Sequence, residues 1–167
     1  MNQKNAIIKR FGMVHHPEGG AFVETYRSSL LVANQEANER VASTGILFLL
    51  GRDEFSAFHR IKSDEMWHFY SGDSLRIIEI SPAGDLKETR LGINFIEGEL
   101  CQYVVPAGAW FASIPVMDGV HGFSFVGCTV APGFDFSDFE LADEDELTQA
   151  FPQHRATIHS LIHASRL

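Results

Sequence analysis

Nine short segments rich in phenylalanine, valine, isoleucine and tyrosine lie between residues 21 and 130 of this 167-residue chain. Turn-forming glycine, proline, aspartate and serine residues separate them. Because no helical segment lies between them, they predict an antiparallel sandwich or barrel. The predicted strands are 22–27, 44–50, 56–61, 65–70, 75–80, 86–91, 102–105, 109–113 and 123–130.

Helices are expected only near the two ends of the chain. They are predicted over the first dozen residues, over 144–150, and from 152 or 153 to about 164. In the last of these, Ile158, Leu161 and Ile162 recur at helical spacing and form one apolar stripe. The polar segment 31–40 is predicted to be a loop.

The chain shows no internal repeat, low-complexity segment or linker. The sequence therefore predicts a single domain over residues 1–167. Its barrel core is expected to cover about 21–135, with a helical tail over about 143–165.

Charge and hydropathy exclude several classes of partner. Thirteen basic residues against twenty-two acidic ones give a formal net charge of −9, which disfavours binding to nucleic acid or to an anionic membrane. No apolar run approaches the roughly 18 residues of a membrane-spanning helix, and the N-terminus lacks the apolar stretch of a signal peptide. Two cysteines do not make a disulfide framework. We therefore expect a cytoplasmic protein with free thiols.

The hairpin predicted around Ser63 and Asp64 carries the chemistry-bearing residues. Side chains alternate between the two faces of a strand, so His59 and Ile61 share a face of one strand and Glu65 and Trp67 share a face of the next. Pairing of the two strands would bring His59 and Glu65 together on a mostly apolar face. A carboxylate buried there must be paired, hydrogen-bonded, metal-bound or shifted in pKa. This pattern predicts a functional site, although structural ion pairs produce the same signature.

Other candidate residues have simpler explanations. His159 and His163 lie four residues apart without the glutamate of a metalloprotease helix, which is typical of a solvated helix surface. Glu18, Glu24 and Arg27 are expected to form a structural network of turn and strand, with a role in the pocket as the alternative.

The spacing around the hairpin resembles the first motif of the cupin superfamily. His59, Glu65 and Gly72 match the first histidine, the glutamate and the final glycine of that motif. Ile61 stands where the second histidine is expected. Pro106-Ala107-Gly108 matches the centre of the second cupin motif, but Phe111 stands at its histidine position.

A closer resemblance covers most of the chain. Residues 16–20, 24–27, 63–68 and 130–136 look like a family of small single-domain cupins of unassigned function. The resemblance implies an all-β double-stranded β-helix, or jelly-roll cupin barrel, with short N-terminal and C-terminal helices. It also implies a homodimer and a likeness in shape to nucleotide-sugar epimerases. Because an open jelly roll leaves edge strands that need covering, we predict a homodimer or a higher oligomer of dimers.

The resemblance and the residues together suggest a protein that binds a small polar molecule, sugar-like or nucleotide-like, inside the barrel. Metal-free acid–base chemistry of the isomerase or epimerase type would then use His59 as base, with Glu65 orienting it or Tyr26 acting as acid. Trp67, Trp110, Phe111 and Ile61 are the expected ligand-binding residues, with filling of the core as the alternative for both tryptophans.

Two other functions stay open at this point. A metal-dependent cupin enzyme, an oxygenase or isomerase, would hold a divalent metal with His59 and Glu65 and would need a further ligand such as His121 or His68. A non-catalytic sensor or binding module would use the same cavity. Because Ile61 and Phe111 cannot donate a lone pair, the sequence predicts no tightly bound metal.

Overall fold

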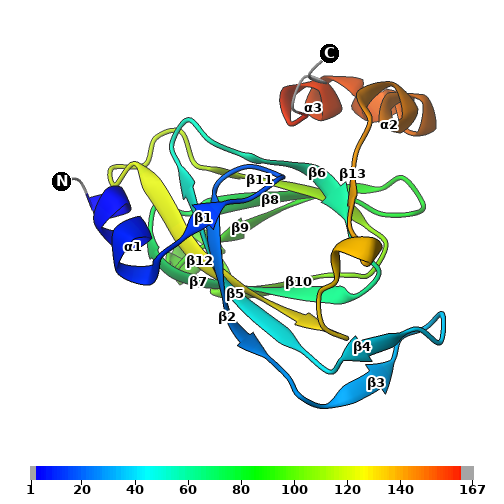
Figure 1. The fold of residues 1–167 in the computed structure, drawn as a ribbon. Coiled ribbons are helices and arrows are strands. Elements are labelled where there is room, and N and C mark those ends of the chain that lie inside the picture. Colours follow the sequence, from blue (N-terminus) through cyan, green and yellow to red (C-terminus); the bar gives the residue numbers. More distant parts are fainter. Residues whose placement is uncertain (1–2, 163–167) are drawn as a thin grey trace.

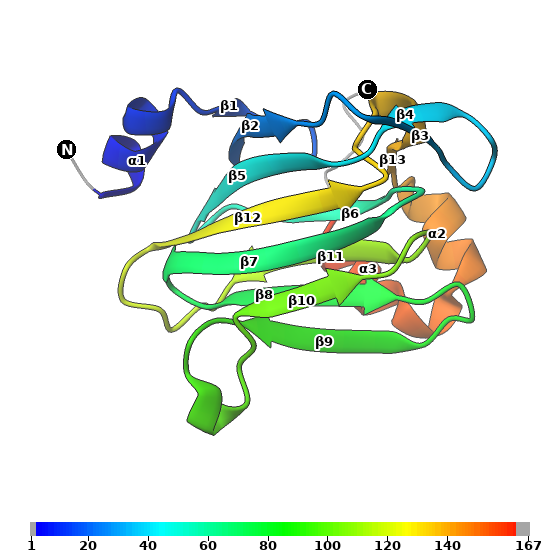
Figure 2. The same ribbon diagram turned by 90° about the horizontal axis from the view of Figure 1, so that it is seen from below.

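Two antiparallel sheets face each other in the computed structural model, which describes residues 3–162 (Figures 1 and 2). The six-stranded sheet contains, in spatial order, β1 (Val14–His15), β2 (Ala21–Arg27), β5 (Thr44–Gly51), β12 (Phe123–Ala131), β7 (Asp64–Gly72) and β10 (Gln102–Val105). The five-stranded sheet contains β13 (Glu140–Leu141), β6 (Ser56–Arg60), β11 (Trp110–Pro115), β8 (Leu75–Ile80) and β9 (Leu86–Leu91). The predicted all-β jelly roll is confirmed.

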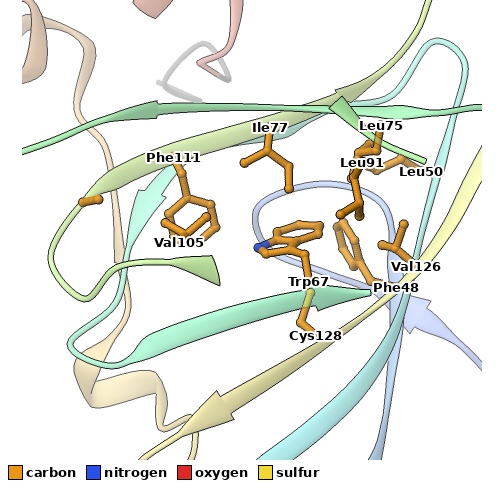
Figure 3. Packing of buried hydrophobic residues seen from close by; sticks show 11 residues of the cluster. Phe48, Leu50, Trp67, Leu75, Ile77, Leu91, Val105, Phe111, Val126 and Cys128 are labelled. Atoms are coloured by element: carbon orange, nitrogen blue, oxygen red, sulfur yellow. The ribbon is translucent and has the colours of Figure 1, made fainter. Parts of the chain in front are cut away.

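The core between the sheets follows from the alternation of side chains along each strand. On β7, Trp67 points inward and is 1% exposed, whereas its neighbour Met66 points outward and is 37% exposed. The indole of Trp67 meets the rings of Phe48 and Phe111 edge to face, at centroid distances of 6.0 and 6.2 Å (Figure 3). Aromatic rings prefer this geometry because the electropositive edge of one ring meets the electronegative face of another.

The C-terminal segment covers the five-stranded sheet, as Figure 1 shows. It consists of α2 (Glu144–Ala150), the 3₁₀ turn η3 (Pro152–His154) and α3 (Arg155–Ser160). The Asp143 carboxylate caps α2 by accepting the Glu146 N–H at 3.0 Å. Leu147 and Ile158 are buried against Ile78 of β8. The predicted helix over 144–150 is confirmed. The helix predicted from 152 or 153 to about 164 begins as the 3₁₀ turn η3 and ends at Ser160, and His163 lies outside the described residues.

At the other end, α1 (Gln3–Phe11) places Ile7 and Ile8 against Leu49 and Phe123. The helix expected over the first dozen residues is thus present. Among the described helices, none is both long and apolar enough to cross a membrane.

The segment 31–40 is not a loop, contrary to the sequence prediction. β3 (Leu31–Ala33) and β4 (Glu39–Val41) pair into a hairpin. The Asn34 side chain closes its turn by accepting the N–H groups of Glu36 and Asn38 at 3.0 and 2.9 Å. These side-chain hydrogen bonds stabilise the hairpin in place of a buried apolar face. The sequence therefore lacks the alternation of apolar and polar residues from which a strand is predicted.

Candidate functional site

A cavity of about 260 Å³ opens between the sheets, where the inner face of β2, β5, β7 and β12 meets β6 and the segment after β12. Its lining combines ionisable side chains with a larger apolar surface. The lining residues are His16, Glu18, Phe22, Glu24, Arg27, Thr44, Ile46, His59, Ile61, Glu65, Cys128, Val130, Phe134, Asp135, Phe136 and Phe139.

Glu18 reaches the cavity from a tight turn at residues 16–20. Gly20 has a φ of 78°, and a Cβ at this position would lie 2.7 Å from the Leu49 carbonyl oxygen. The turn therefore needs glycine both for its backbone conformation and for its close approach to β5. The Ala57 N–H donates to the Glu18 carbonyl at 2.8 Å, which fixes the turn against β6.

Glu18 and His59 form a buried pair. The His59 Nε2 atom lies 2.9 Å from Glu18 Oε2, and His59 Nδ1 lies 2.7 Å from the Ala57 carbonyl oxygen. Because a carbonyl oxygen only accepts, Nδ1 carries a proton, and Nε2 donates to the carboxylate when the ring is charged.

The pKa values favour that charged pair. Burial alone would lower the pKa of His59, but the charge and hydrogen bond of Glu18 outweigh burial and raise it. Burial alone would raise the pKa of Glu18, but His59 outweighs burial and lowers it. Both shifts favour an imidazolium next to a carboxylate, and two short hydrogen bonds engage the ring nitrogens of His59.

His16 lies on the other side of Glu18. Its Nδ1 accepts the Glu18 N–H at 3.2 Å, and burial lowers the pKa of its ring. The ring is therefore neutral, and it packs edge to face against Phe22 at 4.6 Å. His16 acts as an uncharged wall of the cavity that supports the turn carrying Glu18.

Glu65, on β7, is the second buried carboxyl group of the cavity and is 7% exposed. Burial raises its pKa to about 7, with the charge of Glu18 acting in the same direction and that of His59 opposing it. The Cys128 thiol donates a hydrogen bond to this carboxyl group, and burial raises the pKa of Cys128 as well, so the thiol keeps its proton. Glu65 is thus balanced between its acidic and basic forms near neutral pH.

A β-bulge in β2 decides which residues reach the mouth of the cavity. Glu24 pairs with Ile46 and Arg27 with Thr44, but Tyr26, not Thr25, pairs with Gly45. This extra residue keeps Glu24 and Arg27 on the inner face. The Arg27 Nε and Nη2 atoms donate to the two carboxylate oxygens of Glu24 at 2.9 and 2.7 Å.

The same bulge turns Tyr26 away from the cavity, contrary to the sequence prediction. A Cβ on Gly45 would lie 3.6 Å from the Tyr26 Cβ, so Tyr26 shares the outer face with Gly45 and is 55% exposed. The expected role of Tyr26 as an acid therefore has no support in the geometry.

The other predicted site residues divide into two groups. His59, Glu65 and Ile61 lie together in the cavity lining, and their catalytic or binding roles stay predictions. The predicted pairing of their two strands is wrong: β6 pairs with β11 and β13, whereas β7 pairs with β10 and β12, so His59 and Glu65 reach the cavity from different sheets. Trp67 and Phe111 lie outside the lining, in the core between the sheets. Phe111 nevertheless packs against the His59 ring at a centroid distance of 4.1 Å.

Trp110 also lies outside the cavity lining. Trp110 and Phe111 lie on opposite faces of β11, because adjacent residues of a strand point to opposite faces. The Arg60 guanidinium lies over its ring, 4.4 Å from the ring centroid. The expectation that both tryptophans form cavity walls is therefore wrong in placement.

Sequence reasoning missed several residues of the lining. Glu18, Glu24 and Arg27, for which a pocket role was only the alternative to a structural one, all reach the cavity. The segment 132–139 contributes Phe134, Asp135, Phe136 and Phe139. Three phenylalanines within six residues after Gly133 were the signal that could have predicted this part of the lining. Aromatic residues clustered outside a strand need an apolar surface to pack on.

The donor set does not fit the usual cupin metal centre. Ile61 and Phe111 stand at two of its histidine positions, and both ring nitrogens of His59 are engaged by Ala57 and Glu18. The His68 side chain is on the outer face, with Nε2 2.9 Å from Thr129 Oγ1, and His121 is outside the cavity lining. Across residues 3–162, no group of three or more histidine, cysteine, aspartate or glutamate side chains is arranged to hold a metal ion.

Two solved structures resemble this chain over nearly its whole length. A hypothetical protein from Leishmania major is 38% identical, with a TM-score of 0.92, covering 98% of this chain and 100% of that one. Protein SO0799 from Shewanella oneidensis is 40% identical, with a TM-score of 0.88, covering 99% and 100% of the two chains. Oxalate decarboxylase from Bacillus subtilis is 15% identical with a TM-score of 0.54, over 88% of this chain and 36% of that one, and shares the fold alone.

The sequence comparisons agree. The uncharacterized protein YML079W of Saccharomyces cerevisiae is 32% identical, over 84% of this chain and 76% of that protein. The sequence model of a family described as "Cupin superfamily (DUF985)" matches residues 5–142. With the jelly-roll topology, these matches show that the chain belongs to this family of the cupin superfamily.

Proposed function

We propose that this protein binds a small polar molecule in the cavity and transfers a proton on it through Glu65, in an isomerase- or epimerase-type reaction that uses no metal. One observation carries the proposal: a buried carboxyl group with a pKa of about 7 shares a cavity with the His59–Glu18 pair. A general acid–base group works best when its pKa lies near the working pH, because both of its forms are then populated.

The geometry favours Glu65 over His59 as the group that exchanges the proton. Both ring nitrogens of His59 are engaged, by Ala57 and by Glu18, so the ring is held as a fixed positive charge. In its ionised form, Glu65 would take a proton from a carbon next to a carbonyl group of the ligand. The protonated Glu65 would then return a proton to that carbon or to a neighbouring atom.

The imidazolium of His59 supports both halves of this cycle. It stabilises the Glu65 carboxylate before the transfer and the negative charge on the ligand after it. Glu18 keeps the imidazole charged, so no solvent reorganisation is needed when the proton moves.

Deuterium incorporation from the solvent tests the proposal for any substrate of this class. Purified protein is incubated with a small-metabolite extract in D₂O, and mass spectrometry follows compounds that gain one deuterium at carbon. The wild-type protein should produce such a compound and Glu65→Gln should not. Glu79→Gln is the matched control, because Glu79 is also a buried glutamate, 8% exposed, but bonds to Tyr103 outside the cavity lining. Deuterium incorporation that survives in Glu65→Gln contradicts the proposal, as does a wild-type protein that labels nothing.

A further inference from the structure

Three phenylalanine rings stand roughly at right angles to one another over the cavity. The rings of Phe134 and Phe136 lie 4.9 Å apart at an interplanar angle of 84°. Phe139 lies 5.9 Å from Phe136 at 78° and 6.0 Å from Phe134 at 65°. All three line the cavity, and the His16 ring adds a further wall 6.0 Å from Phe139. The face of an aromatic ring carries negative charge and attracts cations.

The positively charged side chains that line the cavity are already paired with carboxylates. Arg27 is bonded through two nitrogens to both carboxylate oxygens of Glu24, and His59 is bonded to Glu18. Neither offers an unpaired positive charge to a phosphate or carboxylate group. An anionic ligand would have to displace one of these carboxylates, at the cost of leaving it unpaired in a partly apolar site.

The carboxyl groups outside those two pairs are Asp135 and Glu65. Hydrogen bonds from Ser137, with smaller contributions from the charges of Arg40 and Arg27, lower the pKa of Asp135, so its carboxylate is ionised at neutral pH. Arg40 itself is held by Asp138 through two hydrogen bonds of 2.7 and 2.8 Å. The cavity therefore presents excess negative charge beside an aromatic cage.

From this combination we infer that the ligand carries a positively charged ammonium group, held between the rings of Phe134, Phe136 and Phe139 and the carboxylate of Asp135. The inference rests on the proposed function, since the rest of the ligand then extends toward Glu65. It favours an amine-bearing small molecule over a nucleotide or another phosphate ester.

Choline and its neutral isostere 3,3-dimethylbutan-1-ol test the inference, because they share shape and hydroxyl group and differ in charge. Isothermal titration calorimetry of the full chain should give at least about tenfold tighter binding of choline. Inorganic phosphate should bind more weakly than choline. Equal or tighter binding of the neutral alcohol, binding of neither compound, or tighter binding of phosphate overturns the inference.

Two variants test whether the preference for choline arises at Asp135 and the phenylalanine rings. Asp135→Asn removes the charge but keeps the oxygen that accepts the Ser137 N–H and hydroxyl group, and Phe136→Leu removes one aromatic face from a side chain that is 55% exposed. Each should reduce the preference for choline several-fold. The matched controls, Asp118→Asn and Phe95→Leu, are exposed positions outside the cavity lining and should leave it unchanged. If the controls reduce the preference as much as the cavity variants do, the assigned site is wrong.

The two proposals fail in different ways. Glu65→Gln should lose deuterium incorporation and still bind choline more tightly than the neutral alcohol. A wild-type protein that prefers choline but labels no metabolite overturns proton transfer alone. A wild-type protein that labels a metabolite but does not prefer choline overturns the ammonium ligand alone.

Discussion

His59 Nε2 and Glu18 Oε2 lie 2.9 Å apart, in side chains that are only 3% and 8% exposed. A buried ion pair of this kind contributes little net stability, because desolvation of the two charges offsets their attraction. The pair instead fixes a positive charge where Glu65 faces the cavity. Its position, in the same cavity as a second buried carboxyl group, is the basis of the proposed proton transfer.

Replacement of Glu18 should lower the pKa of His59. In Glu18→Gln the charge that outweighs burial is gone, so burial dominates and the ring loses its proton at a lower pH than in the wild-type protein. An NMR titration of the His59 ring signals measures this directly. The exposed His159 serves as internal reference, and an unchanged His59 pKa would show that Glu18 does not hold the charge.

Glu65→Gln should change how stability depends on pH. The folded pKa of Glu65, about 7, lies above its ordinary value of 4.5, so the folded state binds the proton more tightly than the unfolded state. The contribution of Glu65 to the free energy of unfolding of the wild-type protein therefore falls by about 3 kcal/mol as the pH rises from about 4.5 to above 7.

The glutamine variant lacks that loss. Its free energy of unfolding, relative to wild type, should become more favourable between pH 5 and pH 8 when both are measured by urea denaturation. A pH-independent difference between Glu65→Gln and wild type would mean that Glu65 is ionised throughout that range.

Trp67→Phe should test whether Trp67 belongs to the core or to the ligand site. The side chain is 1% exposed, and among the described residues its Nε1 atom has no hydrogen-bond partner. Phenylalanine removes that unsatisfied donor but leaves unfilled space, so we expect a loss of only about 1 to 2 kcal/mol in denaturant unfolding. Choline binding should be unchanged. A variant that has wild-type stability but no longer binds choline would show that Trp67 belongs to the ligand site.

The purified protein should contain no stoichiometric transition metal. Ile61 and Phe111 replace two cupin ligands, and His59 is engaged through both of its ring nitrogens. Elemental analysis of freshly purified protein is the measurement. One equivalent of zinc, iron, manganese or nickel per chain that disappears in His59→Ala would show that the hydrogen-bonded arrangement gives way to a metal centre.

We propose that the protein forms a homodimer or a higher oligomer of dimers through the outer face of the six-stranded sheet. Tyr26 and Tyr70 are each at least half exposed there, and a Cβ on Gly127 would meet the Tyr70 ring. Large exposed aromatic side chains on one sheet face are typical of an interface. Light scattering at micromolar concentration should give at least twice the chain mass, and Tyr70→Lys should shift it toward the monomer. A wild-type monomer contradicts the proposal.

Local patterns in the sequence were enough to predict the strands and part of the site. Side chains alternate with a period of two in any strand, and glycine or proline marks the ends, so the nine strands followed from neighbouring residues. The common cavity of His59 and Glu65 was also predicted, but through the pairing of two strands that in the structure belong to different sheets. The resemblance of His59, Glu65 and Gly72 to the first cupin motif also pointed to the superfamily that the family match shows.

Tertiary structure alone decided the remainder of the site. The bulge at Thr25 reverses the faces of Tyr26 and Arg27, and a bulge depends on the partner strand rather than on the bulged one. Glu18 meets His59 because a backbone hydrogen bond to Ala57 joins a turn to a strand far along the chain. Residue types set which side chains can ionise, but burial and long-range contacts set their pKa values, and these exist only once the sheets have closed over the cavity.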